Sequence, residues 1–109
     1  MVYVSVSGFW RCEEFNPIKG QQVYMVEIEK SKRDSTQYWL GNFHNQDIYE
    51  GIIATLDDSS LIITQQSLPS AIIKTGAGII STDFTRIEFN YEVFDGQSDY
   101  NVYAIFTRP

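Results

Sequence analysis

Hydrophobic and polar residues alternate with a period of two along most of the chain. In the stretch 86–94, apolar side chains stand at positions 87, 89, 91 and 93, with polar or charged side chains between them. Such alternation is typical of an antiparallel strand that buries one face. No stretch of about 11 or more residues has the clean apolar spacing of an amphipathic helix. The pattern therefore predicts an all-β protein.

Polar turns rich in Asn, Asp, Ser, Gly and Pro divide the chain into eight such stretches. We expect strands at 6–14, 21–30, 36–43, 48–57, 61–66, 71–81, 86–94 and 99–108. Because the connections are short, consecutive strands should pair as antiparallel hairpins. An open meander of this length would leave two unpaired edges, and closure removes them. The 109 residues are therefore predicted to form one domain, a closed eight-stranded antiparallel up-and-down β-barrel.

The charge balance narrows the possible partners. The formal net charge is −6, from 14 acidic and 8 basic residues, and the basic residues are scattered. Proteins that bind polyanions normally present a basic face, so we expect no nucleic-acid partner. No run of about 20 apolar residues is present, so we expect no membrane-spanning segment. The first residues also lack the charged and apolar regions of a signal peptide.

One cysteine, Cys12, and one histidine, His44, limit the available chemistry. An internal disulfide and a multi-thiolate zinc site are impossible, and we expect neither metal nor cofactor. A Cys12–His44 nucleophile pair is conceivable, but no third group that would orient it is visible. The interpretation that we favour places Cys12, partly buried, in the first strand. It places His44 in a solvated turn formed by Asn42, Asn45 and Asp47.

The acidic residues do not suggest a catalytic pair. Glycosidase-like chemistry needs two carboxylates that converge within about 5–9 Å. Neighbouring strand residues point to opposite faces, so Glu13 and Glu14 cannot share one cleft. Glu27 and Glu29 share a face, but it is opposite the apolar face and is expected outside. We therefore expect no catalytic residues and no enzymatic activity.

The apolar positions define the predicted barrel interior. An eight-stranded barrel is wide enough to be filled by side chains or to hold one small ligand. Gly76, Gly78 and Ala104 would leave room for a ligand, although the glycines equally suit a strand kink or bulge. The side chains expected to face inward are Tyr24, Val26, Ile28, Tyr38, Leu40, Ile52, Ala54, Leu56, Ile63, Ile80, Ile87, Phe89, Tyr91, Val102, Ala104 and Phe106. Among them, the candidate ligand-binding residues are Tyr24, Tyr38, Leu40, Ile52, Phe89, Tyr91 and Phe106.

Gly8-Phe9-Trp10 lies in the first strand, and Arg108 ends the last one. This Gly-x-Trp pattern resembles the signature of lipocalins and the wider calycin group. The stretches 75–81, 87–91 and 95–96, with Asn42-Phe43, look like the small lipocalin-like domains of exported lipoproteins in Bacteroidetes-type bacteria. The chain is shorter than a typical lipocalin and lacks its carboxy-terminal helix.

This resemblance implies a structural contact that closes one end of the barrel, a cellular location and a class of ligand. In that group a basic residue of the last strand packs over the tryptophan at the closed end, which assigns Gly8, Trp10 and Arg108 to a structural latch. The alternative is that Trp10 and Arg108 contact a ligand. The resemblance also implies a bacterial domain that is periplasmic or anchored to the outer membrane, and a barrel that binds a small hydrophobic ligand.

Three aromatic residues are expected to point outward: Trp39, Phe94 and Tyr103. Exposed aromatics are typical of contact surfaces, so these residues are candidates for a homodimer or partner interface. Scattered aromatics without a partner are the alternative. Our leading hypothesis is a non-enzymatic lipocalin-like module that binds a small apolar ligand. The second is a protein or glycan interaction module with a filled barrel and an outer aromatic surface.

Overall fold

The computed structural model describes residues 2–109, and nearly all of their regular structure is β-strand. The strands are β1 (Gly8–Asn16), β2 (Gly20–Lys30), β3 (Gln37–Gly41), β4 (Gly51–Asp57), β5 (Ser60–Ile63), β6 (Gln66–Leu68), β7 (Ala71–Ile80), β8 (Arg86–Phe94) and β9 (Asp99–Thr107). One short 3-10 helix, η1 (Phe43–Asn45), lies between β3 and β4. These bounds agree closely with the predicted strands.

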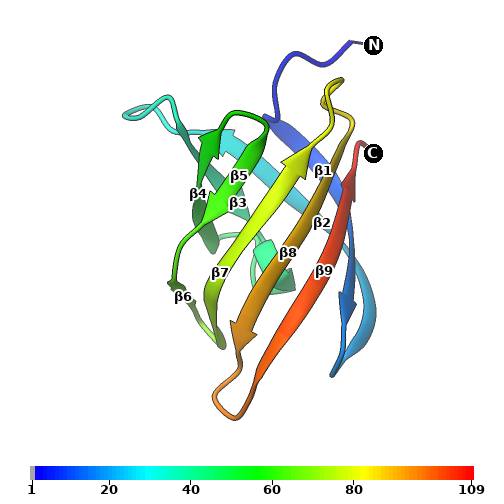
Figure 1. Ribbon diagram of the computed structural model, residues 1–109, viewed down its shortest axis with the longest axis vertical. Coiled ribbons are helices and arrows are strands. Elements are labelled where there is room, and N and C mark those ends of the chain that lie inside the picture. Colours follow the sequence, from blue (N-terminus) through cyan, green and yellow to red (C-terminus); the bar gives the residue numbers. More distant parts are fainter. Residues whose placement is uncertain (1) are drawn as a thin grey trace.

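The sheet closes on itself into a barrel (Figure 1). β1 pairs with β2 on one side and with β9 on the other, and the pairing of β5 with β7 completes the ring. Eight strands form this ring, and β6 lies outside it, paired with the beginning of β7. The predicted eight-stranded antiparallel, lipocalin-like barrel is thus confirmed. The two ends of the chain lie at the same end of the barrel.

The prediction of one continuous strand at 61–66 is wrong, because β5 ends at Ile63 and a separate strand, β6, begins at Gln66. At this break the side chain of Gln66 pairs with the backbone of β4. Its Oε1 accepts from the Ile53 N–H and its Nε2 donates to the Ile53 carbonyl, each at 2.7 Å. The amide satisfies both backbone groups of Ile53, so the chain can bend away from β4 without leaving them unpaired.

The barrel interior is filled by side chains. All residues that the sequence predicts to face inward are buried, except Leu56, which is half-buried. β1 adds Trp10, Cys12 and Glu14 to this interior, each with no exposed surface. Trp10 and Cys12 are apolar or weakly polar and fit a packed core, whereas Glu14 is a buried charge that needs partners.

The glycines of β7 make room for neighbouring side chains. A Cβ atom added to Gly78 would lie 2.5 Å from the ring of Phe89, and one added to Gly76 would lie 2.5 Å from the Cβ of Tyr91. The shift in strand register falls between Ile73 and Thr75, just before these glycines. The space that the glycines leave is therefore occupied by the protein's own aromatic rings.

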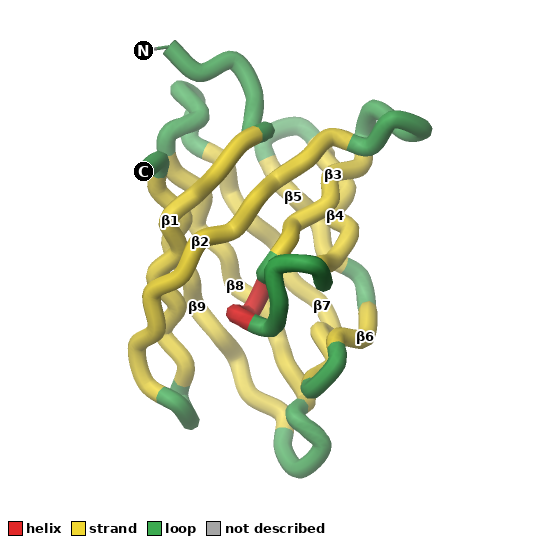
Figure 2. Tube along the Cα trace, turned by 180° about the vertical axis from the view of Figure 1, so that it is seen from behind, coloured by secondary structure: helices red, strands yellow, loops and turns green. Residues whose placement is uncertain are grey.

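Residues 42–50 form a segment whose first residues enter the barrel. Asn42, His44 and Asn45 have left-handed backbone conformations, with φ values of 64°, 61° and 56°, a region that Asn and His adopt more readily than most residues. These turns direct Phe43 and His44 inward, where they are 1% and 4% exposed. The expectation of a solvated turn at His44 is therefore wrong. Figure 2 shows this segment against the barrel between β2 and β6.

Candidate functional site

A buried carboxylate, Glu14, lies in the half of the barrel opposite the chain ends. Its Oε1 accepts hydrogen bonds from the hydroxyls of Tyr24, at 2.6 Å, and Tyr91, at 3.1 Å. The same oxygen is 3.2 Å from His44 Nδ1, and Oε2 accepts from Asn16 Nδ2 at 3.1 Å. Within residues 2–109, no buried side-chain nitrogen or oxygen lacks a hydrogen-bond partner. The carboxylate is therefore fully compensated, as a buried charge must be.

His44 joins this cluster to Tyr100 on β9. Its Nδ1 is 2.9 Å from the hydroxyl of Tyr91, and its Nε2 is 3.5 Å from that of Tyr100. The neighbouring Phe43 packs on Tyr91 with ring centroids 4.7 Å apart, and on Phe89 at 5.6 Å. The segment 42–50 thus fills this half of the barrel with one apolar and one basic ring.

The cluster sets the ionisation of its members. Burial by itself raises the pKa of the Glu14 carboxyl. The hydrogen bond and charge of His44, with the hydrogen bonds of Tyr24 and Asn16, outweigh burial and lower this pKa to about 2. Burial, followed by the neighbouring charged and hydroxyl groups, raises the pKa of Tyr24 and of Tyr91 well above 10. Glu14 is therefore an anion that accepts from neutral tyrosine hydroxyls.

The structure does not support the Cys12–His44 pair. Burial raises the pKa of the Cys12 thiol to about 12, so the nucleophilic thiolate is not formed near neutral pH. The hydrogen bonds of the His44 ring within residues 2–109 go to Glu14, Tyr91 and Tyr100. The histidine therefore serves the carboxylate cluster and does not activate the cysteine.

Sequence reasoning missed Glu14, although a signal for it was present. Glu14 shares strand parity with Trp10 and Cys12, so a buried Trp10 places Glu14 inside the same barrel. His44 carried no such signal, because Asn and Asp around it are ordinary turn formers. Its burial depends on three left-handed residues whose side chains are also typical of exposed turns.

The latch residues meet at the end of the barrel that holds both chain ends, here named the latch end. The Arg108 guanidinium lies 3.9 Å from the centre of the Trp10 ring and 4.1 Å from that of Tyr3. It also donates to the carbonyls of Phe84, Ser7 and Ser5. Arg108 thereby ties the N-terminal segment to the turn between β7 and β8.

Gly8 and Trp10 complete these contacts. Gly8 has a φ of 124°, and a Cβ atom at this position would lie 3.2 Å from Arg108 Nη1. Only glycine adopts this conformation without strain. The Trp10 indole N–H donates to the Val6 carbonyl at 2.9 Å. Val6 is consequently held over the end of the barrel, where it is 2% exposed.

A cavity of about 220 Å³ lies beside the latch. Its walls come from Val6 in the N-terminal segment, from the turns at 58–59 and 81–84, and from Tyr38, Leu56 and Ile80 in the strands. The hydroxyls of Tyr24 and Tyr91 donate to Glu14 and that of Tyr103 donates to Glu88. The Tyr38 hydroxyl binds no group within residues 2–109, and because no fully buried oxygen there lacks a partner, this oxygen keeps some accessible surface. The cavity is thus mainly apolar, and its polar lining consists of the Tyr38 phenol and of turn residues such as Asp58 and Thr82.

Most of the predicted ligand-binding residues are engaged elsewhere. Tyr24 and Tyr91 bind Glu14. Leu40, Ile52, Phe89 and Phe106 have 1% or less exposed surface in the core. Tyr38 is the member of this set that lines the latch-end cavity. Ligand contact by any of the seven residues stays a prediction.

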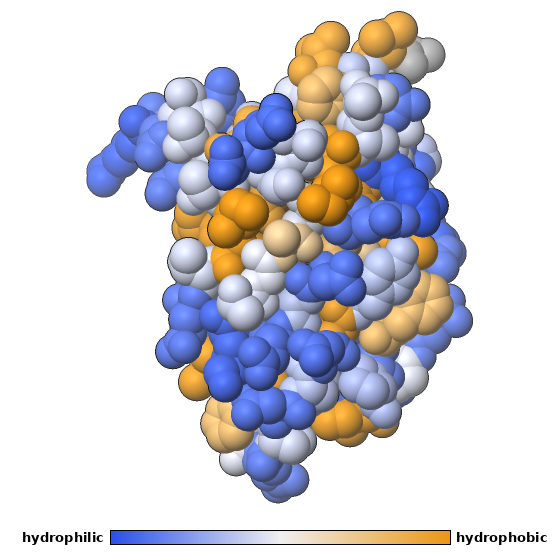
Figure 3. All heavy atoms as spheres, viewed as in Figure 1, coloured by the Kyte–Doolittle hydropathy of each residue, from blue (hydrophilic) through white to orange (hydrophobic). Residues whose placement is uncertain are grey.

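The outward aromatic residues lie apart from one another. Trp39, on β3, packs over Gly41 and Gly51 and is half-buried for that reason. Tyr103, on β9, stacks on Phe15, and β1 and β2 separate β9 from β3 in the sheet. Phe94 ends β8 and lines a different surface hollow. In Figure 3, hydrophobic residues form separate groups among hydrophilic ones on the face shown.

No protein-family model matches the chain, and no curated protein shows significant similarity to it. The fold nevertheless defines a class, a closed lipocalin-like β-barrel with a latched end and a buried carboxylate cluster. No helix within residues 2–109 combines the length and the apolar character that membrane crossing requires.

Proposed function

We propose that this barrel is a non-enzymatic module that binds a small apolar ligand in the latch-end cavity. The observation that carries this proposal is a mainly apolar cavity of about 220 Å³ whose lining includes the Tyr38 hydroxyl. Small-molecule sites are typically apolar hollows with a few polar groups that fix orientation. The resemblance to exported lipocalin-like domains supports the same function and belongs to the proposal.

The size of the cavity limits the ligand. An apolar cavity of about 150 Å³ can hold benzene, so one of about 220 Å³ suits a bicyclic aromatic molecule or a short aliphatic chain. A ligand with a single hydroxyl would hydrogen-bond Tyr38, and such a bond contributes about 0.5–1.5 kcal/mol. This corresponds to an affinity difference of roughly 2- to 10-fold.

Naphthalene and 2-naphthol are suitable probes, with binding followed by amide chemical shifts in NMR titrations. The substitution Ile80→Phe places a ring in the cavity wall and is expected to weaken binding of both probes at least 10-fold. Ile79→Phe is the matched control, because Ile79 is the preceding residue of β7 and is 55% exposed. Tyr38→Phe should weaken binding of 2-naphthol but leave that of naphthalene unchanged.

Two results would contradict the proposal. One is the absence of amide chemical-shift changes at the latch end in a solution saturated with naphthalene. The other is equal affinity of the wild type and the Ile80→Phe variant, which would place the probe elsewhere on the protein.

A further inference from the structure

The outer face of the barrel carries a row of neutral amides and aromatic rings across four adjacent strands. Gln21 pairs with Phe15, Phe15 pairs with Tyr103, and Tyr103 pairs with Asn90. The row therefore has an amide on β2, an aromatic ring on β1, a second ring on β9 and a second amide on β8. Because adjacent strands lie about 4.8 Å apart, the two amides are separated by roughly 14 Å.

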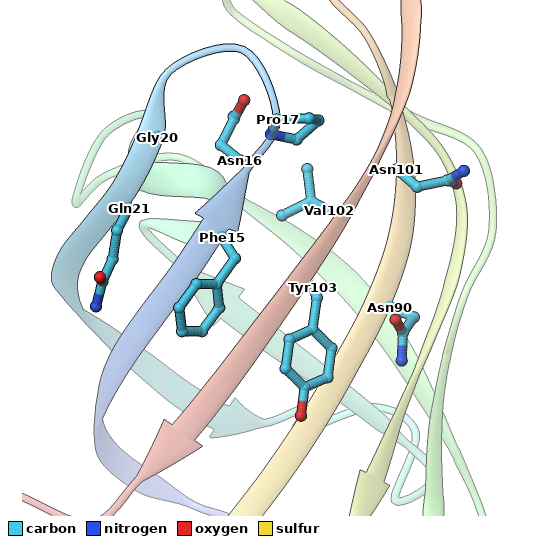
Figure 4. A pocket seen from close by; sticks show the side chains of 9 residues that line it. All are labelled: Phe15, Asn16, Pro17, Gly20, Gln21, Asn90, Asn101, Val102 and Tyr103. Carbon is cyan, nitrogen blue, oxygen red and sulfur yellow. The ribbon is translucent and has the colours of Figure 1, made fainter.

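The two rings at the centre form a fixed platform. Their centroids are 5.9 Å apart with an interplanar angle of 28°, and Figure 4 shows them side by side on the outer surface. The Tyr103 hydroxyl donates to Glu88 Oε1 at 3.2 Å, and Arg86 binds the same carboxylate at 2.8 Å. A ligand that stacks on this platform would order few additional side chains, which favours binding.

The platform lies in a shallow groove of about 360 Å³ that opens to solvent. Asn101, on the same face of β9 as Tyr103, adds a third amide to its border. The side-chain amide of Asn16, also at this groove, already donates a hydrogen bond to Glu14 and accepts two from the backbone of the following turn. Gln21, Asn90 and Asn101 are instead exposed, with their amides available to a ligand.

We propose that this groove binds a neutral pyranose sugar. The C–H face of a pyranose is apolar and slightly positive, and it fits the electron-rich face of an aromatic ring. Sugar hydroxyls both donate and accept hydrogen bonds, as do Asn and Gln amides. No charged side chain lines the groove within the described chain, which disfavours a phosphate. The net charge of −6 disfavours nucleic acid.

The spacing of the two rings suits a disaccharide in which each pyranose covers one ring. The flanking amides of Gln21 and Asn90 would then bind hydroxyls at the two ends of the disaccharide. This site is independent of the latch-end cavity, because it lies outside the barrel on β1, β2, β8 and β9.

NMR titration with maltose, cellobiose, lactose and N,N′-diacetylchitobiose tests this site directly. We expect at least one of them to shift the side-chain amide signals of Gln21 and Asn90. Tyr103→Leu and Gln21→Ala should each weaken its binding at least 5-fold, whereas Tyr103→Phe, which keeps the ring, should bind within about 2-fold of the wild type.

Matched controls come from exposed residues outside the row. Tyr49→Ala, on the 42–50 segment, and Gln65→Ala, before β6, should leave sugar binding unchanged. The proposal is overturned if no disaccharide shifts these signals at 50-fold molar excess and at concentrations of about 0.1 M. It is also overturned if Tyr103→Leu binds like Tyr103→Phe, or if only a proline-rich peptide occupies the rings.

Discussion

Replacing Glu14 with glutamine tests whether the buried carboxylate cluster holds the barrel together. A glutamine side chain has nearly the same shape but cannot satisfy all the partners of Glu14. Asn16 cannot rotate to help, because its Oδ1 accepts from the backbone N–H groups of Ile18 and Lys19 at 2.9 and 3.0 Å. Either the new Nε2 faces Asn16 Nδ2, donor against donor, or the tyrosines and His44 lose their shared acceptor.

The magnitude follows from the pKa of Glu14. Its carboxyl has a pKa of about 2 instead of 4.5, and each tenfold change in an ionisation equilibrium is worth about 1.4 kcal/mol. The charged form therefore stabilises the fold by about 3 kcal/mol above pH 4.5. Loss of one partner from a buried charge cluster typically costs about 3–5 kcal/mol, which agrees with this figure. We expect Glu14→Gln to lower the free energy of unfolding by about 3 kcal/mol.

The pH dependence has a definite sign. A carboxyl whose pKa is lowered on folding stabilises the folded state above its unfolded pKa, and this contribution is lost as the pH falls through the folded pKa. The wild type should therefore lose about 3 kcal/mol between pH 4.5 and pH 2. The Glu14→Gln variant should lack this part of the acid dependence, because it has no proton to bind at that site.

Urea unfolding followed by tryptophan fluorescence, repeated from pH 7 to pH 2.5, measures both effects. Glu13→Gln is the matched control, because Glu13 is the adjacent residue and its partner Arg11 is 45% exposed. Exposed ion pairs contribute about 0–1 kcal/mol, so the control should change little. An unfolding free energy within about 1 kcal/mol of the wild type, or an unchanged acid slope, would refute this account of Glu14.

Three further substitutions or reactions probe the rest of the interior. Trp10→Ala should lower the unfolding free energy by about 3–5 kcal/mol, because the buried indole and its contact with Arg108 are both lost; an unchanged melting temperature would remove the latch role. Gly78→Ala should destabilise the barrel by about 1–3 kcal/mol, because the new Cβ meets the Phe89 ring, and chemical denaturation measures it. Cys12, with a thiol pKa raised to about 12, should react with Ellman's reagent at pH 8 no faster than the protein unfolds. A rapid stoichiometric reaction would contradict its burial.

The regular part of the fold was accessible from the sequence because one periodicity governs it. Each strand alternates, and each connection is a short polar turn, so strand spans and inward faces follow together. The break after Ile63 was not accessible in the same way. It depends on the Gln66 side chain acting as a strand partner for Ile53, and nothing in a run of apolar and polar residues distinguishes such a glutamine from an exposed one.

The candidate sites also differ in how far the sequence could predict them. The contact between Trp10 and Arg108 joins residues far apart in the chain, and the Gly-x-Trp motif, the eight strands and the arginine of the last strand together led us to expect it through the resemblance to lipocalins. The amide and aromatic row was only partly visible, because Tyr103 was expected outside but its register with Phe15 and Asn90 was not known. Register between strands depends on turn lengths and packing, so a surface site that spans four strands appears only in the folded structure.

The interior chemistry explains why both proposed ligand sites lie away from the barrel centre. A fully hydrogen-bonded carboxylate in one half and closely packed aromatic rings around Phe89 leave the centre occupied by the protein itself. Admitting a ligand there would break a charge cluster worth about 3 kcal/mol as well as apolar packing. A ligand at the latch end or on the outer groove requires neither change, because the cavity and the amides are already open. Binding at these two places can therefore coexist with a rigid core, and it should show little dependence on Glu14 at pH 7.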